Sequence, residues 1–226
     1  MKASLNQDHP LGPGLQPLAA GIGPGAEQGP AQSKPLFPWE DPQLGLSPAL
    51  GRTLKGVLFQ PGRFFGGHRP GSGLAAPFIF GLAAASTGLM LALFCPALVS
   101  VVTLTRPGPL ATIGFGASLA GIVLAPVPVL IWLVVQSLGG HVCLMILGAG
   151  SQGLAATLRA LSYSAAACLF LPLPVVGPGL AWLWGTVVWI VGLSRLQGVS
   201  PGRVTAALLG PPLVLVLVLI YLAGRI

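Results

Sequence analysis

Long uncharged apolar blocks dominate the chain after residue 77. They cover residues 77–104, 107–158, 160–194 and 204–224. A helix needs about 20 residues to cross the ~30 Å hydrocarbon core of a bilayer, so each block is long enough to span a membrane. Only 7% of the residues are charged, whereas soluble domains carry about 25%. The sequence therefore predicts an all-α integral membrane protein built as a helical bundle.

The breaks within these blocks predict the number of spans. In the second block, one span near residues 113–146 precedes the glycine-rich turn "LGAGSQG". As one helix, the third block would overshoot the bilayer by about 20 Å at a rise of 1.5 Å per residue. The prolines of "LPLPVVGPG" would also break it. We therefore expect two short spans in residues 160–194 and five spans in all, or four if this block is re-entrant.

The distribution of basic residues favours a cytoplasmic N-terminus. Cytoplasmic loops are enriched in Lys and Arg. A five-span topology leaves only Arg106 and Arg225 on the opposite side. The residues that it puts on the cytoplasmic side are Arg52, Lys55, Arg63, Arg69, Arg159, Arg195 and Arg203.

Acidic side chains are missing from the whole apolar region. The four in the chain are Asp8, Glu27, Glu40 and Asp41. This pattern excludes paired-carboxylate catalysis, acidic metal sites and Asp/Glu proton relays within the embedded part. The three cysteines are isolated from one another, which indicates small apolar side chains rather than zinc ligands or disulfides. We expect no cofactor, no metal and no nucleic-acid partner, since topology explains the scattered bases better than a phosphate footprint does.

The residues before the first span divide into two segments. Residues 1–45 are rich in Pro and Gly and lack apolar periodicity, so they predict a disordered cytoplasmic tail. Residues 46–69 predict an interfacial amphipathic segment, and residues 70–226 form the transmembrane domain.

The amphipathic segment begins with a helix capped by Ser47 and ended by Pro61-Gly62. Its apolar face would carry Leu50, Leu54, Val57 and Leu58. Basic residues and a Phe pair follow, which suits the headgroup level of a membrane. The expected interfacial anchor consists of Arg52, Lys55, Arg63, Phe64, Phe65 and Arg69.

Polar side chains gather at two places within the spans. One lies near the end of the second span, and the other is "TLRALSYS", residues 157–164. Polar residues inside a membrane are costly and usually face other helices, so we expect these two groups to meet. We expect Arg159 to snorkel to the interface. The predicted polar cluster is Gln136, His141, Arg159, Ser162, Tyr163 and Ser164.

One fragment invites an enzymatic interpretation. Ser118 in "GFGASLAG", with His141 downstream, would suit an intramembrane Ser-His hydrolase. However, Ala117, Gly121 and Ala125 form a ladder of small residues that lets helices approach closely. Helix packing is the better interpretation of this fragment, and no catalytic residue is expected.

Four stretches follow one another in this order: "PWE", "TLKGVLFQPGRFFGG", "ATLRALSYSAA" and "LAWLWGTVVWIVGLSRLQGVSPGR". Together they resemble the bacterial branch of the Yip domain family, the Ypt-interacting-protein-like membrane proteins, and the resemblance covers residues 38 to about 222. It implies a five-span helical domain with a cytosolic N-terminus and no enzymatic activity. Eukaryotic members are tied to Rab-type GTPases, transport vesicles and membrane shaping, but the Pro/Gly-rich tail offers no matching GTPase-binding surface.

These observations predict a non-catalytic, multi-pass protein of the bacterial cytoplasmic (inner) membrane. It would organise the membrane or recruit partners. The expected partners are the lipid bilayer and membrane or cytosolic proteins, and the protein could also associate with itself. The alternative is a transporter or channel subunit for a neutral, anionic or lipid substrate, because spans interrupted by Pro and Gly can line cavities.

Overall fold

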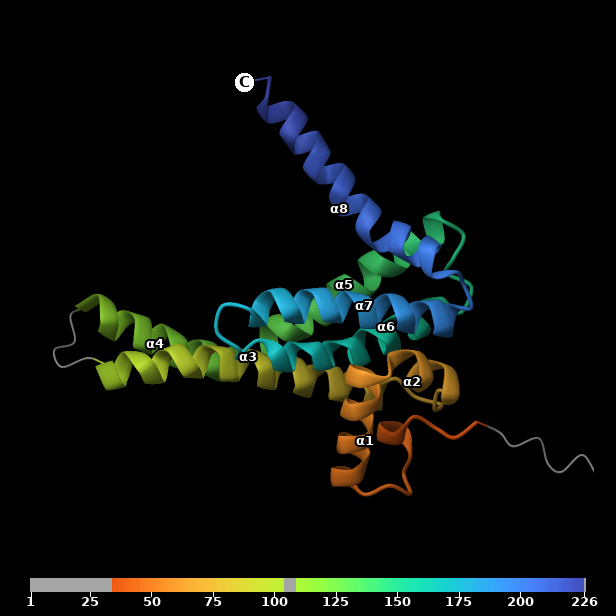
Figure 1. Cartoon of the computed structure of the whole chain (residues 1–226), viewed down its shortest axis with the longest axis horizontal. Helices are drawn as coiled ribbons and strands as arrows, with labels where there is room; N and C mark the ends of the chain where they lie inside the picture. The colour runs from red at the N-terminus through yellow and green to blue at the C-terminus, as the bar shows by residue number, and fades with distance from the viewer. Residues whose placement is uncertain (1–33, 104–108, 226) are drawn as a thin grey trace, which may run out of the picture. The chain divides into compact units, whose positions relative to one another are not determined.

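The computed structural model describes residues 34–103 and 109–225, with the side chains of residues 34–94, 116–211, 217 and 220–225. Every secondary-structure element assigned in this part of the chain is a helix, which confirms the all-α class (Figure 1). An isolated bridge pairs Leu36 with Arg69. The elements are η1 (Pro38–Glu40), α1 (Leu46–Phe59), α2 (Pro61–Gly67), α3 (Ala75–Thr103), α4 (Pro109–Leu124), α5 (Pro126–Ile146), α6 (Gly153–Ser164), η2 (Ala165–Phe170), α7 (Gly177–Gln197) and α8 (Pro201–Ala223).

Four helical segments among the described residues are long and apolar enough to cross a membrane. They are Ala75–Phe94 of α3, α5, α6 continued by η2, and α7. The two spans expected within residues 160–194 are present, since a proline-containing turn separates η2 from α7. Helix α8 follows where the fifth span is expected, so a count of about five describes the chain.

The second apolar block differs from the prediction of one span near residues 113–146. It forms two helices, α4 and α5, which meet at Ala125 with Pro126 at the first position of α5. Proline has no N–H to donate, so the helical hydrogen bonding is interrupted there. Helix α4 packs on α3, whereas α5 continues into the bundle beside α6 and α8.

Small residues let α3 approach the backbone of α6 and η2. Gly81 and Gly88 lie two turns apart on one face of α3, with buried Ala84 and Ala85 between them. A Cβ at Gly81 would lie 2.7 Å from Cα of Ser162. A Cβ at Gly88 would overlap the carbonyl oxygen of Cys168. Such close contact replaces the hydrophobic effect as the packing force inside a bilayer.

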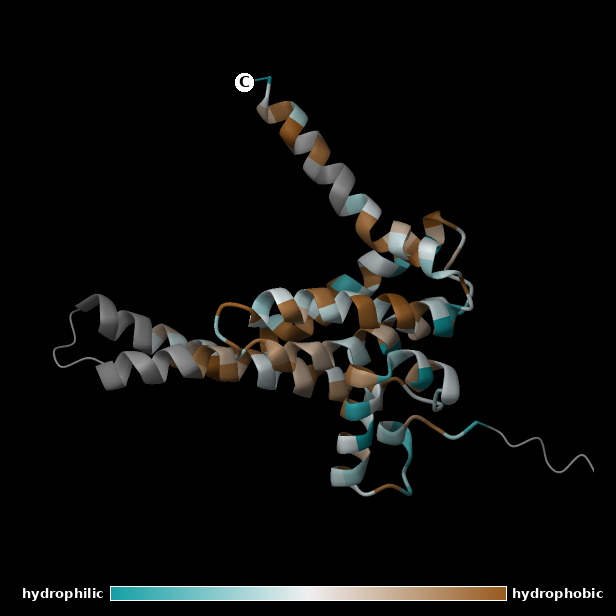
Figure 2. Ribbon diagram, in the orientation of Figure 1, coloured by the Kyte–Doolittle hydropathy of each residue, from teal (hydrophilic) through white to brown (hydrophobic). Residues whose placement is uncertain are grey.

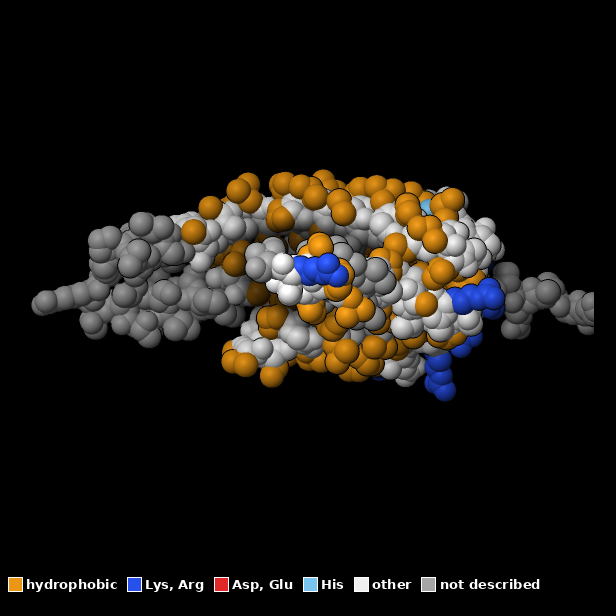
Figure 3. Space-filling view, turned by 90° about the horizontal axis from the view of Figure 1, so that it is seen from above, with side chains coloured by type: hydrophobic (Ala, Val, Ile, Leu, Met, Phe, Trp, Pro, Cys, Tyr) orange, Lys and Arg blue, Asp and Glu red, His pale blue; other side chains and the backbone are white. Residues whose placement is uncertain are grey.

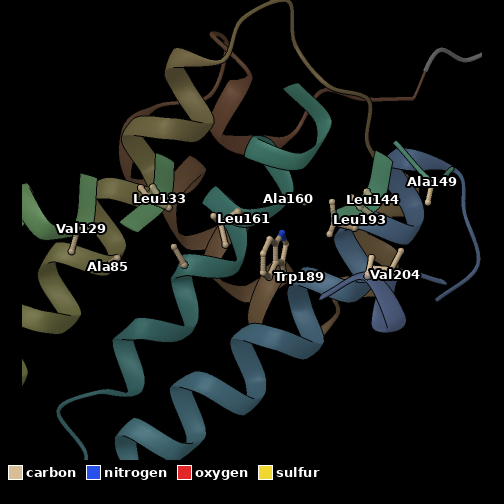
Figure 4. Close-up of a cluster of buried hydrophobic side chains, with 12 residues drawn as sticks. Ala85, Val129, Leu133, Leu144, Ala149, Ala160, Leu161, Trp189, Leu193 and Val204 are labelled. Carbon is tan, nitrogen blue, oxygen red and sulfur yellow. The ribbon is translucent and has the colours of Figure 1, made fainter. Parts of the chain in front are cut away.

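Two clusters of buried side chains hold the bundle. The first joins α5, α6, α7 and α8 through residues such as Leu133, Leu161, Leu193 and Val204 (Figure 4). The second is largely aromatic and lies under α1, α2 and η1.

Large apolar side chains such as Val135 and Val142 of α5 point outward. Figure 2 shows apolar residues recurring along α3, α5 and α7, while α1 and α2 are more polar. The outer surface of the bundle suits lipid contact.

Helix α1 runs across the direction of α3, α6 and α7 (Figure 1). Its buried residues are Ala49, Thr53 and Val57. This face is rotated by about one residue from the predicted one, and Leu50 is 41% exposed. The small side chains of Ala49 and Thr53 suit close packing on η1 and α2, which the hydrophobic pattern does not reveal. The helix is capped by Gly45 instead of Ser47, and Pro61 starts α2 after it.

Candidate functional site

Residues 34–41, hereafter the N-terminal segment, fold onto the bundle. The Phe37 side chain is fully buried, and its N–H donates to the Arg69 carbonyl at 3.3 Å. The Arg69 N–H donates to the Pro35 carbonyl at 2.8 Å. The Trp39 indole N–H donates to the Ala76 carbonyl at the start of α3, at 2.7 Å. The prediction of a disordered tail over residues 1–45 is therefore wrong for residues 34–45; residues 1–33 lie outside the described part.

Phe37 completes a cluster of aromatic rings that meet in tilted and edge-on arrangements. Its centroid lies 5.0 Å from that of Phe64, 6.2 Å from Phe65 and 5.2 Å from Tyr163. Phe64 and Phe65 are 2% and 3% exposed, so they belong to the protein core and not to the headgroup level where we expected them. Gly192 on α7 makes room for this cluster, since a Cβ there would lie 2.9 Å from the Phe65 ring.

Beside the aromatic cluster, Glu40 forms a buried ion pair with Arg159. The carboxylate oxygen Oε1 accepts from Arg159 Nε at 2.9 Å and from the Tyr163 hydroxyl at 2.8 Å. The other oxygen, Oε2, accepts from Arg159 Nη2 at 3.3 Å and from the Gly71 N–H at 2.6 Å. Arg159 Nη2 also donates to the carbonyls of Gly71 and Gly73, at 3.1 and 2.6 Å. The Arg159 and Glu40 side chains are only 7% and 3% exposed.

This pairing corrects the prediction that Arg159 snorkels to the interface. A charge buried in an apolar environment needs an opposite charge and hydrogen bonds, and Glu40 supplies both. Paired in this way, Arg159 adds no net charge to the side of the membrane on which it lies.

Sequence reasoning missed Glu40, although a signal was present. An arginine within an apolar region calls for a carboxylate, and all four acidic residues precede residue 42. Its partner in this chain therefore had to come from the N-terminal residues.

His141 belongs to a different polar group. Its Nδ1 lies 3.2 Å from the Thr157 hydroxyl, which also accepts from Gln197 Nε2 at 3.1 Å. Gln197 is 2% exposed, and its Oε1 accepts from the Gln152 N–H at 2.8 Å. The group ties the end of α7 to the start of α6. Gln197 was not among the predicted residues, because a glutamine at a helix end looks like an ordinary surface residue.

The predicted polar cluster is thus divided. Arg159 and Tyr163 meet at Glu40, and His141 bonds Thr157. Gln136 and Ser164 line a cavity of about 250 Å³ between α5, η2 and α7. The Ser162 hydroxyl is buried against α3 and has no hydrogen-bond partner in the described part of the chain. One continuous cluster of these six residues does not form.

The geometry of the ion pair suits a structural role. A carboxylate has about four lone-pair sites, and four donors occupy those of Glu40. The described residues contain no group of three or more His, Cys, Asp or Glu side chains that could hold a metal ion. The arrangement joins the N-terminal segment to α6 and leaves no lone pair of Glu40 for a reactant.

The basic residues of the expected anchor lie at the surface. Arg52, Lys55, Arg63 and Arg69 are all exposed. In Figure 3, Lys and Arg side chains lie near the middle and at one end of the face shown, and no acidic side chain is visible on it. This part of the expected anchor, unlike its two phenylalanines, is available to lipid or to a partner.

A family model described as the Yip1 domain matches residues 55–223. No curated protein and no solved structure matches the chain. Arg159 and Tyr163 lie within the matched region, whereas Glu40 precedes it.

Proposed function

The chain belongs to the Yip1-domain family of membrane proteins, and on this premise we propose that it is a non-catalytic membrane organiser or partner-recruiting protein of the bacterial cytoplasmic membrane. The observation that carries the proposal is the Glu40–Arg159 pair, since its buried charges bind each other and the backbone. Charged side chains of the kind that catalyse reactions in enzymes stabilise the fold in this protein.

Two kinds of surface support this proposal. Apolar side chains such as Val135 on α5 and Trp182 on α7, 60% and 68% exposed, suit lipid or the helix of a partner. The polar surface of α1 and α2 carries exposed bases that suit anionic groups. Both suit contact with lipid or with another protein.

The same bases support a cytoplasmic N-terminus. Arg195 lies in the last turn of α7 and Arg203 in the first turn of α8, and Gly66 of α2 lies near Arg195. Helix α8 has 23 residues and extends about 35 Å at 1.5 Å per residue, so Arg225 would lie on the opposite side of the membrane. Excess bases on one side favour the cytoplasm. Reporter fusions at residues 176 and 226 test this: both should be periplasmic, and a cytoplasmic residue 226 would contradict the topology.

Crosslinking at native abundance tests the recruiting role. A photoreactive residue replaces Lys55 on the exposed polar side of α1, and a matched one replaces Val135 on the apolar surface of α5. We expect adducts with a defined protein at residue 55 that are absent at residue 135, where lipid predominates. Adducts at neither position, with the protein isolated alone in mild detergent, would contradict recruitment.

The cavity between α5, η2 and α7 favours a second candidate function, a transporter or channel subunit. It is lined by aromatic side chains and by a few polar ones, including Gln136, Ser164 and Thr186. A mostly apolar cavity with few polar groups suits a neutral or lipid substrate. Flux of candidate solutes into proteoliposomes that is lost in Gln136→Leu and kept in Lys55→Gln would favour this candidate over the first.

A further inference from the structure

A second concave site lies on the other side of the aromatic cluster, between α1 and α2. It is a pocket of about 240 Å³, hereafter the basic pocket. Four polar side chains line it: Arg52 of α1, Gln60 between the helices, Arg63 of α2 and His68 just after α2. Its volume is several times the ~30 Å³ share of a water molecule in the liquid, so it can admit a larger polar group.

The pocket is a consequence of how α1 meets α2. Gln60 is the C-cap of α1 and the N-cap of α2, so the two helices diverge from this residue. Gly56 lies against Phe64, where a Cβ would be 2.7 Å from the Phe ring. The helices therefore touch at Gly56 and open toward Arg52 and Arg63. The backbone of the two helices therefore places Arg52 and Arg63 at the same pocket.

His68 is held in a defined position at the edge of the pocket. Its Nδ1 lies 2.8 Å from the Phe64 carbonyl, and its ring stacks on Phe37 with centroids 5.8 Å apart. A carbonyl only accepts, so Nδ1 carries the hydrogen and Nε2 is left for another partner.

The charges of the pocket are not compensated within the described part of the chain. None of the lining residues is acidic. No hydrogen bond or ion pair involves the Arg52 or Arg63 side chain among the described residues. Arg159, by contrast, is paired with Glu40. Two unpaired guanidinium groups at one pocket favour an anion with several acceptor oxygens, and phosphate fits the fork of guanidinium donors.

The position of α1 indicates the source of the phosphate. This helix lies across the direction of the spanning helices, shortly before α3 begins (Figure 1). Leu46 and Phe59, at its two ends, are each 73% exposed. A helix with exposed apolar residues and bases lies along a membrane at the headgroup level. Trp184 of α7 donates to the Leu58 carbonyl at 3.0 Å, and tryptophan favours the same level.

We infer that the basic pocket binds the phosphate of an anionic membrane phospholipid, with Arg52 and Arg63 as its main ligands. A lipid ligand deepens the proposed function, and of that proposal the inference uses only the placement of the protein in a membrane. It gives the protein a way to recognise one class of lipid, beyond general attraction between bases and a negative surface.

The test measures lipid binding by the full-length protein in neutral detergent. The probes are short-chain phosphatidylglycerol, short-chain phosphatidylcholine and inorganic phosphate. The pocket variant is Arg52→Gln with Arg63→Gln, and the matched control is Lys55→Gln with Arg195→Gln, which removes the same charge outside the pocket. We expect phosphatidylglycerol to bind about tenfold or more weakly to the pocket variant, because charge-assisted hydrogen bonds are lost. The control should change by less than about twofold, because neither of its residues lines the basic pocket and single exposed charges contribute little.

Three outcomes would overturn the inference. An equal loss in both double variants would indicate diffuse attraction, and an unchanged pocket variant would remove the site. Inorganic phosphate that binds as tightly as the lipid would make the ligand a free anion. Gln60→Glu is a second variant that adds a carboxylate and keeps both arginines; it should also weaken lipid binding, while the thermal unfolding midpoint reports on the fold. The crosslinking test of recruitment does not depend on any of these results.

Discussion

Replacing Glu40 by Gln should destabilise the protein strongly. The substitution keeps the size of the side chain but removes the negative charge that faces Arg159. Its amide NH₂ would also face donors, because every hydrogen-bond partner of the Glu40 carboxylate is a donor. The arginine would remain buried without an opposite charge.

The magnitude follows from this burial. Removing one partner of a buried ion pair costs about 3–5 kcal/mol, whereas exposed pairs contribute about 0–1 kcal/mol. The 7% and 3% exposure of the two side chains puts this pair in the first class. We therefore expect the free energy of unfolding to fall by about 3–5 kcal/mol in Glu40→Gln. Replacing both partners by Met should cost less than the single change, because no unpaired charge remains.

Titration with SDS from mild detergent, followed by tryptophan fluorescence, measures this free energy. Asp41→Asn is the matched control: among the described residues, the neighbouring carboxylate accepts only from the Gln43 N–H, within an exposed turn, at 2.9 Å. It should change stability by less than about 0.5 kcal/mol. The argument is refuted if Glu40→Gln stays within about 1 kcal/mol of the wild type, as it would for a solvated pair.

Three further substitutions test the packing and the polar contacts. Gly71→Ala should cost about 1–3 kcal/mol, because its Cβ would lie 2.7 Å from Oε2 of Glu40. Gly88→Ala should cost at least as much, since its Cβ would meet the backbone carbonyl of Cys168, which cannot move by a rotamer change. Gln197→Leu should cost about 1–3 kcal/mol by leaving buried groups without partners. The same SDS titration measures all three.

Each of these changes has a control of the same chemistry in open space. Gly73→Ala and Gly139→Ala add a Cβ that meets nothing within 4 Å, so they should be close to neutral. Gln136→Leu removes an exposed amide with no hydrogen bond to the described residues, and it should also be tolerated. Equal losses in a test variant and its control would contradict the packing argument for that position.

The ion pair also bears on how the family domain is bounded in this chain. The matched region begins at residue 55, yet the carboxylate that neutralises Arg159 lies at residue 40. A protein cut at the start of the match would lack Glu40 and Phe37, and it would expose the aromatic cluster. The N-terminal segment is therefore a structural part of the domain.

The sequence by itself determined the membrane class and the main helices. These properties are local: hydropathy over about 20 residues predicts a span, and prolines predict the breaks. Even so, the sequence predicts one span where the structure has the two helices α4 and α5, because the effect of Pro126 depends on how the two helices pack on their neighbours.

Only the tertiary structure decided which polar groups meet. Glu40 and Arg159 are 119 residues apart, and no periodic pattern links a carboxylate before the first span to an arginine inside a later one. The same holds for Phe64 and Phe65, which suit lipid by composition but are covered by Phe37 and Tyr163. A buried arginine in the sequence indicates that a carboxylate is needed, whereas the path of the folded chain decides which carboxylate lies close enough to pair with it.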